Sequence, residues 1–256
     1  MKKIAFSRTL KKIFTSLAWL HRTRKISSMY RKYKKDNESL SPQFRNDYIL
    51  KLSKKLLKVN NIDLEIKGFE NVPKSGGTLI VPNHKSNMDP VALFAALEKQ
   101  DFEQGSKNRI INFLAKKQLE KKFLVKRILK LTDSIIIDRE NFRESLKKLN
   151  EFGEFVRVNK TLGVIFPEGT RVKQEALGEF KSGAFKIAAS NYLTIVPVAI
   201  INSLEAENKK RKGRLKITVS FLKPLKPGNY ITQEPKALAQ RVKELIEMEI
   251  KKYNEQ

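Results

Sequence analysis

The sequence predicts an α/β fold in which a mixed, largely parallel sheet is flanked by helices and preceded by a pair of basic amphipathic helices. From residue 59 onward, short uninterrupted apolar runs alternate with helical stretches. Such runs are typical of strands that are buried on both faces of a sheet. Before residue 59, apolar side chains recur at helical spacing among many lysines and arginines. The chain of 256 residues is long enough for one large core or two modest ones.

Residues 1–58 are expected to form a helical segment at a membrane interface. They hold 17 lysines and arginines against three acids, a surplus of 14 within the chain's net charge of +26. Their two apolar stripes, within residues 10–20 and 49–57, are separated by a polar break around residues 36–42. Such helices can lie in a lipid interface, where each basic residue near an anionic leaflet contributes about 1 kcal/mol. The alternative is that the stripes pack on the protein's own core.

Residues 59–256 are expected to form one α/β domain. Its strands are predicted at residues 64–67, 79–81, 135–137, 164–166 and 195–201. Its helices are predicted at residues 90–99, at residues 142–159, and from about Pro235, since proline suits a first helical turn. Apolar and polar residues alternate over residues 215–221, which favours a strand at an edge of the sheet.

The composition excludes several classes of site and partner. The absence of cysteine excludes disulfides, thiolate metal sites and cysteine nucleophiles, and fits a reducing compartment. The only two histidines, His21 and His84, exclude a multi-histidine metal site. Neither a metal nor a cofactor is expected. The basic surplus calls for an anionic partner. No nucleic-acid-binding signature is found, so an anionic membrane surface is expected and nucleic acid is not. A non-catalytic basic binding protein is the alternative from another functional class.

The first motif whose side chains could take part in a reaction follows the predicted strand 79–81, where the polar loop 82–90 begins. The ends of strands are where α/β sheets usually place their sites. His84 and Asp89 can meet if the loop turns, and the carboxylate would then fix the imidazole tautomer. The motif predicts His84 as a general base oriented by Asp89, although the pair alone also fits a structural loop histidine. Ser86 is expected to bond local backbone groups.

The second motif is Phe-Pro-Glu-Gly-Thr-Arg at residues 166–171, again after a predicted strand. Gly169 allows close approach of the backbone, Thr170 offers a hydroxyl, and Arg171 carries a planar fork that matches phosphate. Alone, the segment also fits a turn with a solvated arginine. Together with the first motif, it predicts a site for a phosphate-bearing ligand.

These two motifs resemble those of the glycerolipid acyltransferases, the family of 1-acylglycerol-3-phosphate acyltransferases. Residues 83–89 resemble the His-x4-Asp motif of that family, and residues 166–171 resemble its phosphate-binding motif residue for residue. Residues 137–139 and 195–198 are similar to two further blocks in the expected order. The resemblance covers roughly residues 60–225.

The resemblance implies a reaction, its substrates and its location. A fatty acyl group would move from a thioester, acyl-CoA or acyl-carrier protein, to the sn-2 hydroxyl of lysophosphatidate, which gives phosphatidate. Because a thioester is already activated, no enzyme nucleophile is needed. The protein would act at the cytoplasmic face of the cell membrane as a peripheral or monotopic enzyme. Another lysophospholipid or a glycolipid is the alternative acceptor.

The resemblance also implies roles for individual residues. The residues expected to hold the acceptor phosphate are Arg139, Glu168, Gly169, Thr170 and Arg171. Because a carboxylate repels phosphate, Glu168 is expected to orient Arg171 or to bond the acceptor hydroxyl. Lys116 and Lys181 are candidates for support of the oxyanion or the acceptor. Lys116 lies in a stretch like a lysine-bearing block of the family, although Gln118 replaces the acid expected there, and the segment of Lys181 equally fits a helix start.

Overall fold

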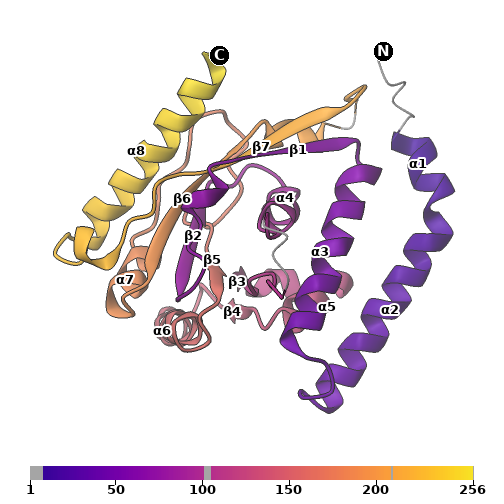
Figure 1. Ribbon diagram of the computed structural model, residues 1–256, viewed down its shortest axis with the longest axis horizontal. Coiled ribbons are helices and arrows are strands. Elements are labelled where there is room, and N and C mark those ends of the chain that lie inside the picture. Colours follow the sequence, from indigo (N-terminus) through magenta and orange to yellow (C-terminus); the bar gives the residue numbers. More distant parts are fainter. Residues whose placement is uncertain (1–7, 101–104, 209, 256) are drawn as a thin grey trace.

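The computed structural model describes residues 8–100, 105–208 and 210–255, which form a seven-stranded sheet between two layers of helices (Figure 1). The strands are β1 (Ile62–Lys67), β2 (Thr78–Pro82), β3 (Ile111–Lys116), β4 (Ile135–Ile137), β5 (Leu162–Val164), β6 (Thr194–Ile201) and β7 (Leu215–Phe221). The α-helices are α1 (Arg8–Phe14), α2 (Ser16–Lys35), α3 (Pro42–Val59), α4 (Asp89–Ala96), α5 (Phe123–Leu131), α6 (Phe142–Val158), α7 (Gly183–Ser190) and α8 (Pro235–Asn254). Short 3-10 turns include η2 (Lys117–Lys121) and η3 (Ser203–Glu207).

The strand order β1-β7-β6-β2-β5-β3-β4 confirms a mixed, largely parallel sheet. Every neighbouring pair is parallel except β6 and β7. The expected edge position of residues 215–221 was wrong, because β7 lies between β1 and β6. Of its polar residues, Lys216 is exposed, but Thr218 and Ser220 are buried and bonded: the Thr218 hydroxyl donates to Glu65 and the Ser220 hydroxyl to Glu249 of α8. The alternation at Thr218 and Ser220 therefore reflects satisfied polar groups and not a wet face.

Each face of the sheet carries its own core, and β2 contributes to both. Ile80 packs in the cluster beneath α3, α4 and α5, whereas Leu79 and Val81 pack in the cluster beneath α6, α7 and α8. Figure 1 shows these two helix layers on opposite sides of the strands. A strand buried on both faces needs apolar side chains at successive positions, which explains the uninterrupted apolar runs.

Each predicted strand other than residues 164–166 corresponds to a strand of the structure, whereas β3 and the helices α5 and α7 were not predicted. The run at 135–137 is β4, and the run at 195–201 lies within β6. β5 ends at Val164, so the predicted strand 164–166 covers mainly the turn that follows it. β3 was not predicted because Asn112 interrupts its apolar pattern. The Asn112 amide is buried and donates to the backbone of Thr132 at 2.7 Å, which makes a polar residue acceptable inside the sheet.

The N-terminal helices divide between packing and exposure. The helix α3 belongs to the main core through Ile49, Leu50 and Leu57, and the second half of α2 packs with α3 and α5 through Ile26 and Met29. The first half of α2, together with α1, instead leaves a row of large apolar side chains in solvent. This exposed apolar row is formed by Leu10, Ile13, Phe14, Leu17 and Leu20.

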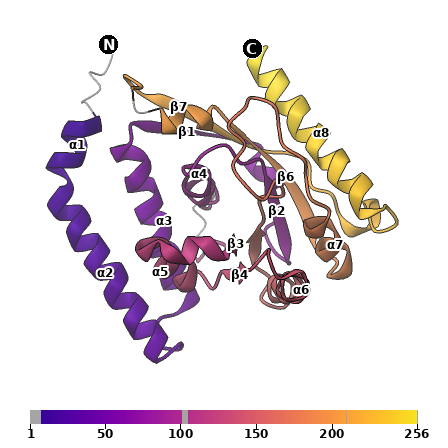
Figure 2. The same ribbon diagram turned by 180° about the vertical axis from the view of Figure 1, so that it is seen from behind.

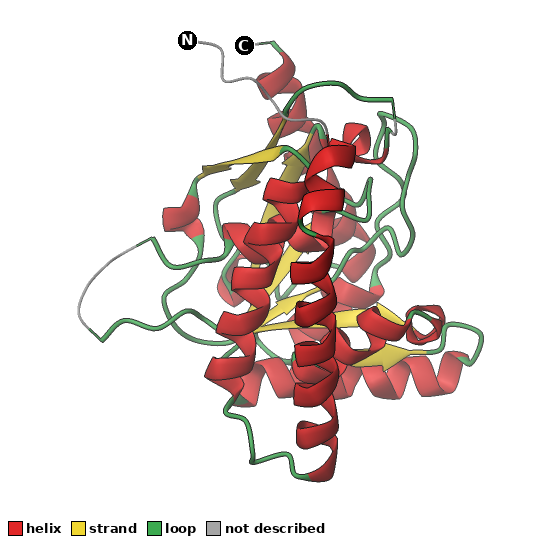
Figure 3. Ribbon diagram, turned by 90° about the vertical axis from the view of Figure 1, so that its right-hand side faces the viewer, coloured by secondary structure: helices red, strands yellow, loops and turns green. Residues whose placement is uncertain are grey.

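The exposed apolar row lies on the outer helix layer of the molecule. Figure 2 shows α1 and α2 along the border farthest from α8, and Figure 3 looks onto this layer from the side. Within the described ranges, no helix combines the length and apolar character that crossing a bilayer requires. Whether residues 1–58 form a unit separate from residues 59–256 stays a prediction.

Candidate active site

The two sequence motifs meet at one edge of the sheet because β2 and β5 are parallel neighbours. The loop after β2 carries His84, and the turn after β5 carries Arg171. The carboxyl ends of β3, β4 and β6 lie at the same edge, since all these strands run in the same direction. The β6 end leads into η3, which brings a further residue, Glu207, to the site. This gathering of strand ends is the usual position of a site in an α/β sheet.

His84 and Asp89 form the pair that the first motif predicts. The imidazole Nδ1 lies 2.8 Å from Asp89 Oδ2, and Asp89 is fully buried as the first residue of α4. The imidazole packs against the Phe166 ring with 4.2 Å between the ring centres. Because the carboxylate engages Nδ1, it selects the tautomer in which Nε2 has the free lone pair. The His84 side chain keeps 17% of its surface exposed.

The Asp89 carboxylate is itself held by the loop that it closes. Its Oδ2 accepts the backbone N–H groups of Lys85 at 2.6 Å and Ser86 at 2.8 Å, and its Oδ1 accepts the Ser86 hydroxyl at 3.1 Å. The Ser86 hydroxyl also accepts the N–H of Met88 at 3.0 Å and is completely buried. These contacts assign Ser86 to the loop, as expected, and fix the carboxylate against the imidazole.

Asn83, which the sequence analysis did not single out, fastens the loop to the neighbouring strand. Its side-chain amide donates to the Ile200 carbonyl at 3.0 Å, and its oxygen accepts the Ile200 N–H at 2.7 Å. The side chain thereby continues the β2–β6 ladder by one more pair of bonds, and it is 1% exposed. No local signal in the sequence reveals this role, because Ile200 is 117 residues away.

Glu168 of the second motif is buried and connects that motif to the first. Its Oε1 accepts the His84 N–H at 2.6 Å, and its Oε2 accepts the Gly178 N–H at 2.8 Å. Glu168 was expected to orient Arg171 or to bond the acceptor, but both of its oxygens instead accept backbone N–H groups. The His84 carbonyl in turn accepts the Val172 N–H at 2.9 Å. The backbone N–H and the backbone carbonyl of His84 therefore both bind groups of the segment that follows β5.

Lys85 is a second connection that sequence reasoning missed. Its ammonium group donates to the carbonyl oxygens of Gln174 and Ala176, and the residue is only 6% exposed. Burial lowers the pKa of the Lys85 ammonium, and the nearby carboxylates of Glu168 and Asp89 oppose that shift. The side chain thus fixes the loop 172–178 beneath the site.

Arg139 and Gly169, two of the residues expected to hold the phosphate, contact each other. The guanidinium Nη1 of Arg139, which follows β4, donates to the Gly169 carbonyl. Gly169 has a φ of +74°, and a Cβ at this position would lie 2.6 Å from that nitrogen. A side chain here would therefore be strained by the left-handed backbone and would displace the Arg139 guanidinium. Thr170 is exposed next to them.

The two candidate lysines lie at the rim of the same edge. Lys116 ends β3 in register with Ile137, two residues before Arg139, and is partly exposed. Lys181 donates its backbone N–H to the Pro167 carbonyl at 3.0 Å, and its side chain is exposed. Both positions border the turn after β5, although no contact of either ammonium group with that turn is recorded in the described residues.

Arg171 is paired with a carboxylate that the sequence did not reveal. Its Nη1 lies 2.8 Å from Glu207 Oε1, and the same oxygen accepts the backbone and side-chain N–H groups of Asn87 at 2.8 Å each. The contact joins residues that are 36 and 120 positions apart. Spacing along the sequence could not have found it.

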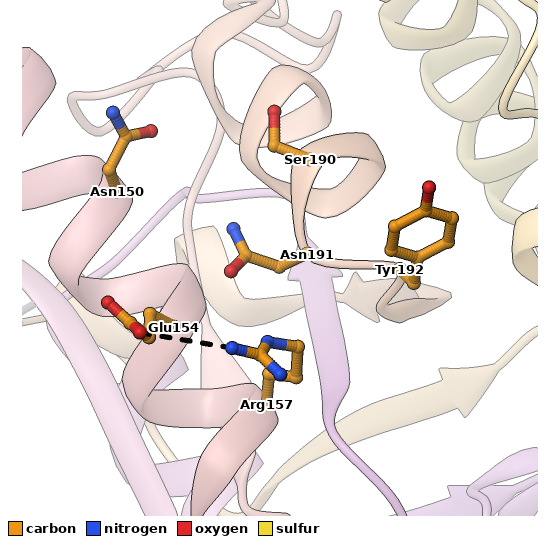
Figure 4. Close-up of a pocket in the computed structure, with 6 residues that line it drawn as sticks. All are labelled: Asn150, Glu154, Arg157, Ser190, Asn191 and Tyr192. Atoms are coloured by element: carbon orange, nitrogen blue, oxygen red, sulfur yellow. Dashed lines mark ion pairs between the residues drawn. The ribbon is translucent and has the colours of Figure 1, made fainter.

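A hollow elsewhere on the surface lacks these features. It has a volume of about 440 Å³ and lies between α6 and the end of α7 (Figure 4). Its lining residues are Asn150, Glu154, Arg157, Ser190, Asn191 and Tyr192. They adjoin the beginnings of β5 and β6, at the opposite edge of the sheet from His84. Across the described ranges, no three acidic or histidine side chains are grouped as metal ligands.

Known proteins share both the sequence and the fold of this chain. Residues 63–201, more than half of the chain, match the model of the acyltransferase family. A probable 1-acyl-sn-glycerol-3-phosphate acyltransferase of Mycoplasma pneumoniae is 36% identical over 216 residues, covering 80% of this chain and 78% of that protein. A protein of the same description from Mycoplasma genitalium is 31% identical, covering 80% and 77% of the two chains.

The fold likeness extends over nearly the whole chain. The crystal structure of the 1-acyl-sn-glycerophosphate (LPA) acyltransferase from Thermotoga maritima matches with a TM-score of 0.74 at 20% sequence identity. The match covers 97% of this chain and 95% of that one. With the ordered motifs, the family match and the Mycoplasma relatives in agreement, the chain belongs to the acyltransferase family, in its group of 1-acyl-sn-glycerol-3-phosphate acyltransferases.

Proposed function

We propose that the protein transfers a fatty acyl group from an acyl thioester to the sn-2 hydroxyl of lysophosphatidate, with His84 as the general base. The observation that carries this proposal is the His84–Asp89 pair, which leaves Nε2 available beside a segment built for phosphate. The names of the Mycoplasma relatives support the acceptor. Acyl-CoA and acyl-carrier protein both present the required thioester.

The reaction proceeds in two proton transfers at the same nitrogen. His84 Nε2 takes the proton of the acceptor hydroxyl as its oxygen attacks the thioester carbonyl, and Asp89 stabilises the imidazolium that forms. When the tetrahedral intermediate collapses, the carbon–sulfur bond breaks and the imidazolium returns the proton to the leaving thiolate. The ester product and the free thiol account for all atoms, so no additional cofactor enters. A general base of this kind contributes about 10²- to 10⁴-fold to the rate.

The turn after β5 holds the acceptor phosphate in this proposal. Arg171 and Arg139 supply charged donors, while the backbone at Gly169 and the hydroxyl of Thr170 complete the contacts. Glu168 acts as a positioning residue, since its carboxylate holds the His84 backbone. Lys116 and Lys181, at the rim, support the oxyanion or the acceptor. A fixed phosphate places the acceptor hydroxyl near His84. Such positioning lowers the activation barrier by roughly several kcal/mol.

The lipid acceptor is reached from an anionic membrane surface, at the cytoplasmic face of the cell membrane. The exposed apolar row on α1 and α2 fits insertion between head groups. The surplus of 14 positive charges in residues 1–58 fits attraction to anionic lipids. In this arrangement the protein is peripheral or monotopic.

The test is acyl transfer from a radiolabelled acyl thioester to lysophosphatidate in vesicles. His84→Ala is expected to lower kcat by at least about 10²-fold while folding and vesicle binding persist. His21→Ala is the matched control, because His21 is the other histidine, lies exposed on α2 and is expected to leave the rate unchanged. Equal rates for wild type and His84→Ala would refute the assignment of the base.

The acceptor is tested with a panel of lysolipids. Lysophosphatidate is expected to give the highest kcat/KM, because its phosphate monoester has the charge and the free oxygens that Arg171 and Arg139 can bind. A lysophospholipid with a larger head group, or a glycolipid, that reacts with a higher kcat/KM would replace lysophosphatidate as the acceptor and leave the acyl-transfer chemistry in place.

A further inference from the structure

The structure points to an anion subsite formed by Asn87 and Arg171. The carboxylate of Glu207 occupies the position that an oxygen of the acceptor phosphate would take, and therefore competes with the phosphate for these donors. We infer that Asn87 is a binding residue for the acceptor and that Glu207 sets the specificity of the site for dianionic head groups. This inference rests on the proposed function, because it assigns further residues to the same acceptor.

The geometry that carries the inference is the convergence of three donors on one oxygen. Glu207 Oε1 accepts Arg171 Nη1, the Asn87 backbone N–H and the Asn87 side-chain amide, each at 2.8 Å. One guanidinium, one backbone amide and one side-chain amide directed at a single point make a binding position for an anionic oxygen. A phosphate oxygen at the same point receives the same three donors.

The position of this subsite suits an acceptor that reacts at His84. Asn87 lies between His84 and Asp89 in the catalytic loop, and Arg171 directly precedes Val172, which is bonded to the His84 backbone. A phosphate held by these donors therefore lies beside the general base. The Arg171 and Glu207 side chains remain 35% and 33% exposed, so that a ligand can reach the pair.

Electrostatics makes Glu207 a competitor and not a partner of the phosphate. A phosphate monoester carries nearly two negative charges and cannot share the oxygen position of a carboxylate without repulsion. The acceptor must therefore displace the Glu207 carboxylate from Arg171 and Asn87. A strongly anionic head group gains enough from the three donors to do so, whereas a neutral or zwitterionic head group gains less. Glu207 thereby raises the KM for every acceptor and favours the most highly charged one.

The decisive variant is Glu207→Gln, assayed with a water-soluble short-chain lysophosphatidate so that partition into vesicles does not enter the result. The amide keeps an oxygen for Asn87 but loses the charge that pairs with Arg171. The KM for lysophosphatidate is expected to fall about three- to tenfold. The decrease is no larger because the partly exposed ion pair between Glu207 and Arg171 is weak and competes only modestly with the phosphate. The kcat and the melting temperature are expected to stay close to those of wild type.

The matched control is Glu205→Gln, which removes the same charge from the same 3-10 turn. Glu205 is exposed and accepts the side-chain amide of Asn208 at 3.0 Å. Removal of the Glu205 charge is expected to change the KM for lysophosphatidate by less than about twofold, since only the long-range electrostatic field of the molecule changes. A similar decrease in both variants would refute the specific competition.

The role of Asn87 is tested in the Glu207→Gln background, where loss of its side chain cannot also release the competitor. Asn87→Ala in that background is expected to raise the KM for lysophosphatidate about three- to tenfold, since a donor to an anionic oxygen is lost. An unchanged KM would remove Asn87 from the subsite. A lower kcat and melting temperature with unchanged KM in Glu207→Gln would instead show that Glu207 only clamps the loop.

Direct binding separates the failure of this inference from the failure of the proposed function. Short-chain lysophosphatidate is titrated calorimetrically into His84→Ala and into His84→Ala with Glu207→Gln, neither of which depends on turnover. Tighter binding to the double variant, about three- to tenfold, supports the subsite even if no acyl transfer is found with the wild-type protein. Equal or weaker binding refutes the subsite, even where wild-type transfer is efficient.

Discussion

At the scale of single residues, the turn after β5 depends on Gly169 for two separate reasons. Its φ of +74° is costly for a side chain, and the position that a Cβ would take is already filled by the Arg139 guanidinium. The motif predicts a glycine at this position for close backbone approach, but only the tertiary contact shows what approaches. The close neighbour is the guanidinium of Arg139, which follows β4.

Gly169→Ala is expected to displace Arg139 and to raise the KM for lysophosphatidate about tenfold or more, with a stability loss of about 1–2 kcal/mol from the left-handed backbone. Acyl-transfer kinetics and thermal unfolding measure the two effects. Gly213→Ala is the matched control, because Gly213 has a φ of +76° with open space around its Cβ position. An equal loss of stability with unchanged KM is expected there, and an equal KM effect in the control would contradict the role of Arg139.

At the scale of elements, a buried cluster fastens the N-terminal helices to the catalytic fold. Arg45 of α3 lies 2.9 Å from the Asp133 carboxylate after α5 and donates to the Leu131 carbonyl at 2.6 Å. Tyr33 of α2 donates its hydroxyl to the same carboxylate, while its ring lies under the Arg45 guanidinium. One carboxylate thus joins α2, α3 and the end of α5.

The Tyr33 contact predicts a loss of stability at alkaline pH. Burial, assisted by the hydrogen bond to Asp133, raises the pKa of the Tyr33 hydroxyl from 10.0 to about 12. Between these two pH values the unfolded chain loses the Tyr33 proton while the folded protein keeps it. The contribution of Tyr33 to the free energy of unfolding is therefore complete below pH 10 and is lost as the pH rises toward 12. Chemical denaturation from pH 9 to 12 measures this decline.

Tyr33→Phe is the comparison for that experiment. It lowers the free energy of unfolding at pH 9 because the bond to Asp133 is lost, but it is expected to flatten the decline above pH 10. Tyr192→Phe is the control, since Tyr192 is 70% exposed. A decline that is equally steep in Tyr33→Phe and wild type would assign the alkaline sensitivity to other groups.

At the scale of the whole molecule, charge and exposed apolar surface coincide on the outer helix layer. The exposed apolar row on α1 and α2 lies at the border farthest from α8 (Figure 1). The site lies at the carboxyl ends of the strands, and α2 is linked to it through α5 and the neighbouring end of β3. Membrane attachment by this row would therefore hold the catalytic edge in a fixed relation to the lipid surface.

Leu17→Asp tests that attachment, because Leu17 is 79% exposed in the middle of the row. In the attached state Leu17 would be buried in the lipid interface, so its loss costs about 1.5–3 kcal/mol of the free energy of membrane binding. The new negative charge is also repelled by anionic lipid. Binding to vesicles containing anionic lipid is expected to fall about tenfold or more, as measured by flotation. Met248→Asp is the control, since Met248 is 58% exposed on α8. An equal decrease in both variants would contradict a specific role of the row.

The sequence by itself determined those features that depend on local order along the chain. Uninterrupted apolar runs marked strands buried on both faces, and helical spacing marked the N-terminal helices, because burial on a strand or a helix repeats with a fixed period. The pair His84 and Asp89 could be predicted because a five-residue turn brings them together whatever the rest of the fold does. A phosphate-binding role of residues 166–171 could be predicted because their residue types match phosphate and resemble a family motif.

Only the tertiary structure decided which distant groups meet at the site. The order of the strands placed β5 and β6 on either side of β2, and this brought Glu168 to the His84 backbone and Asn83 to Ile200. It also brought Glu207 to Arg171, a contact that no spacing rule contains. The same strand order buried β7 between two neighbours, although its alternation resembled an edge strand. Such contacts depend on the pairing of strands that are far apart in the sequence, and local sequence patterns carry no information about that pairing.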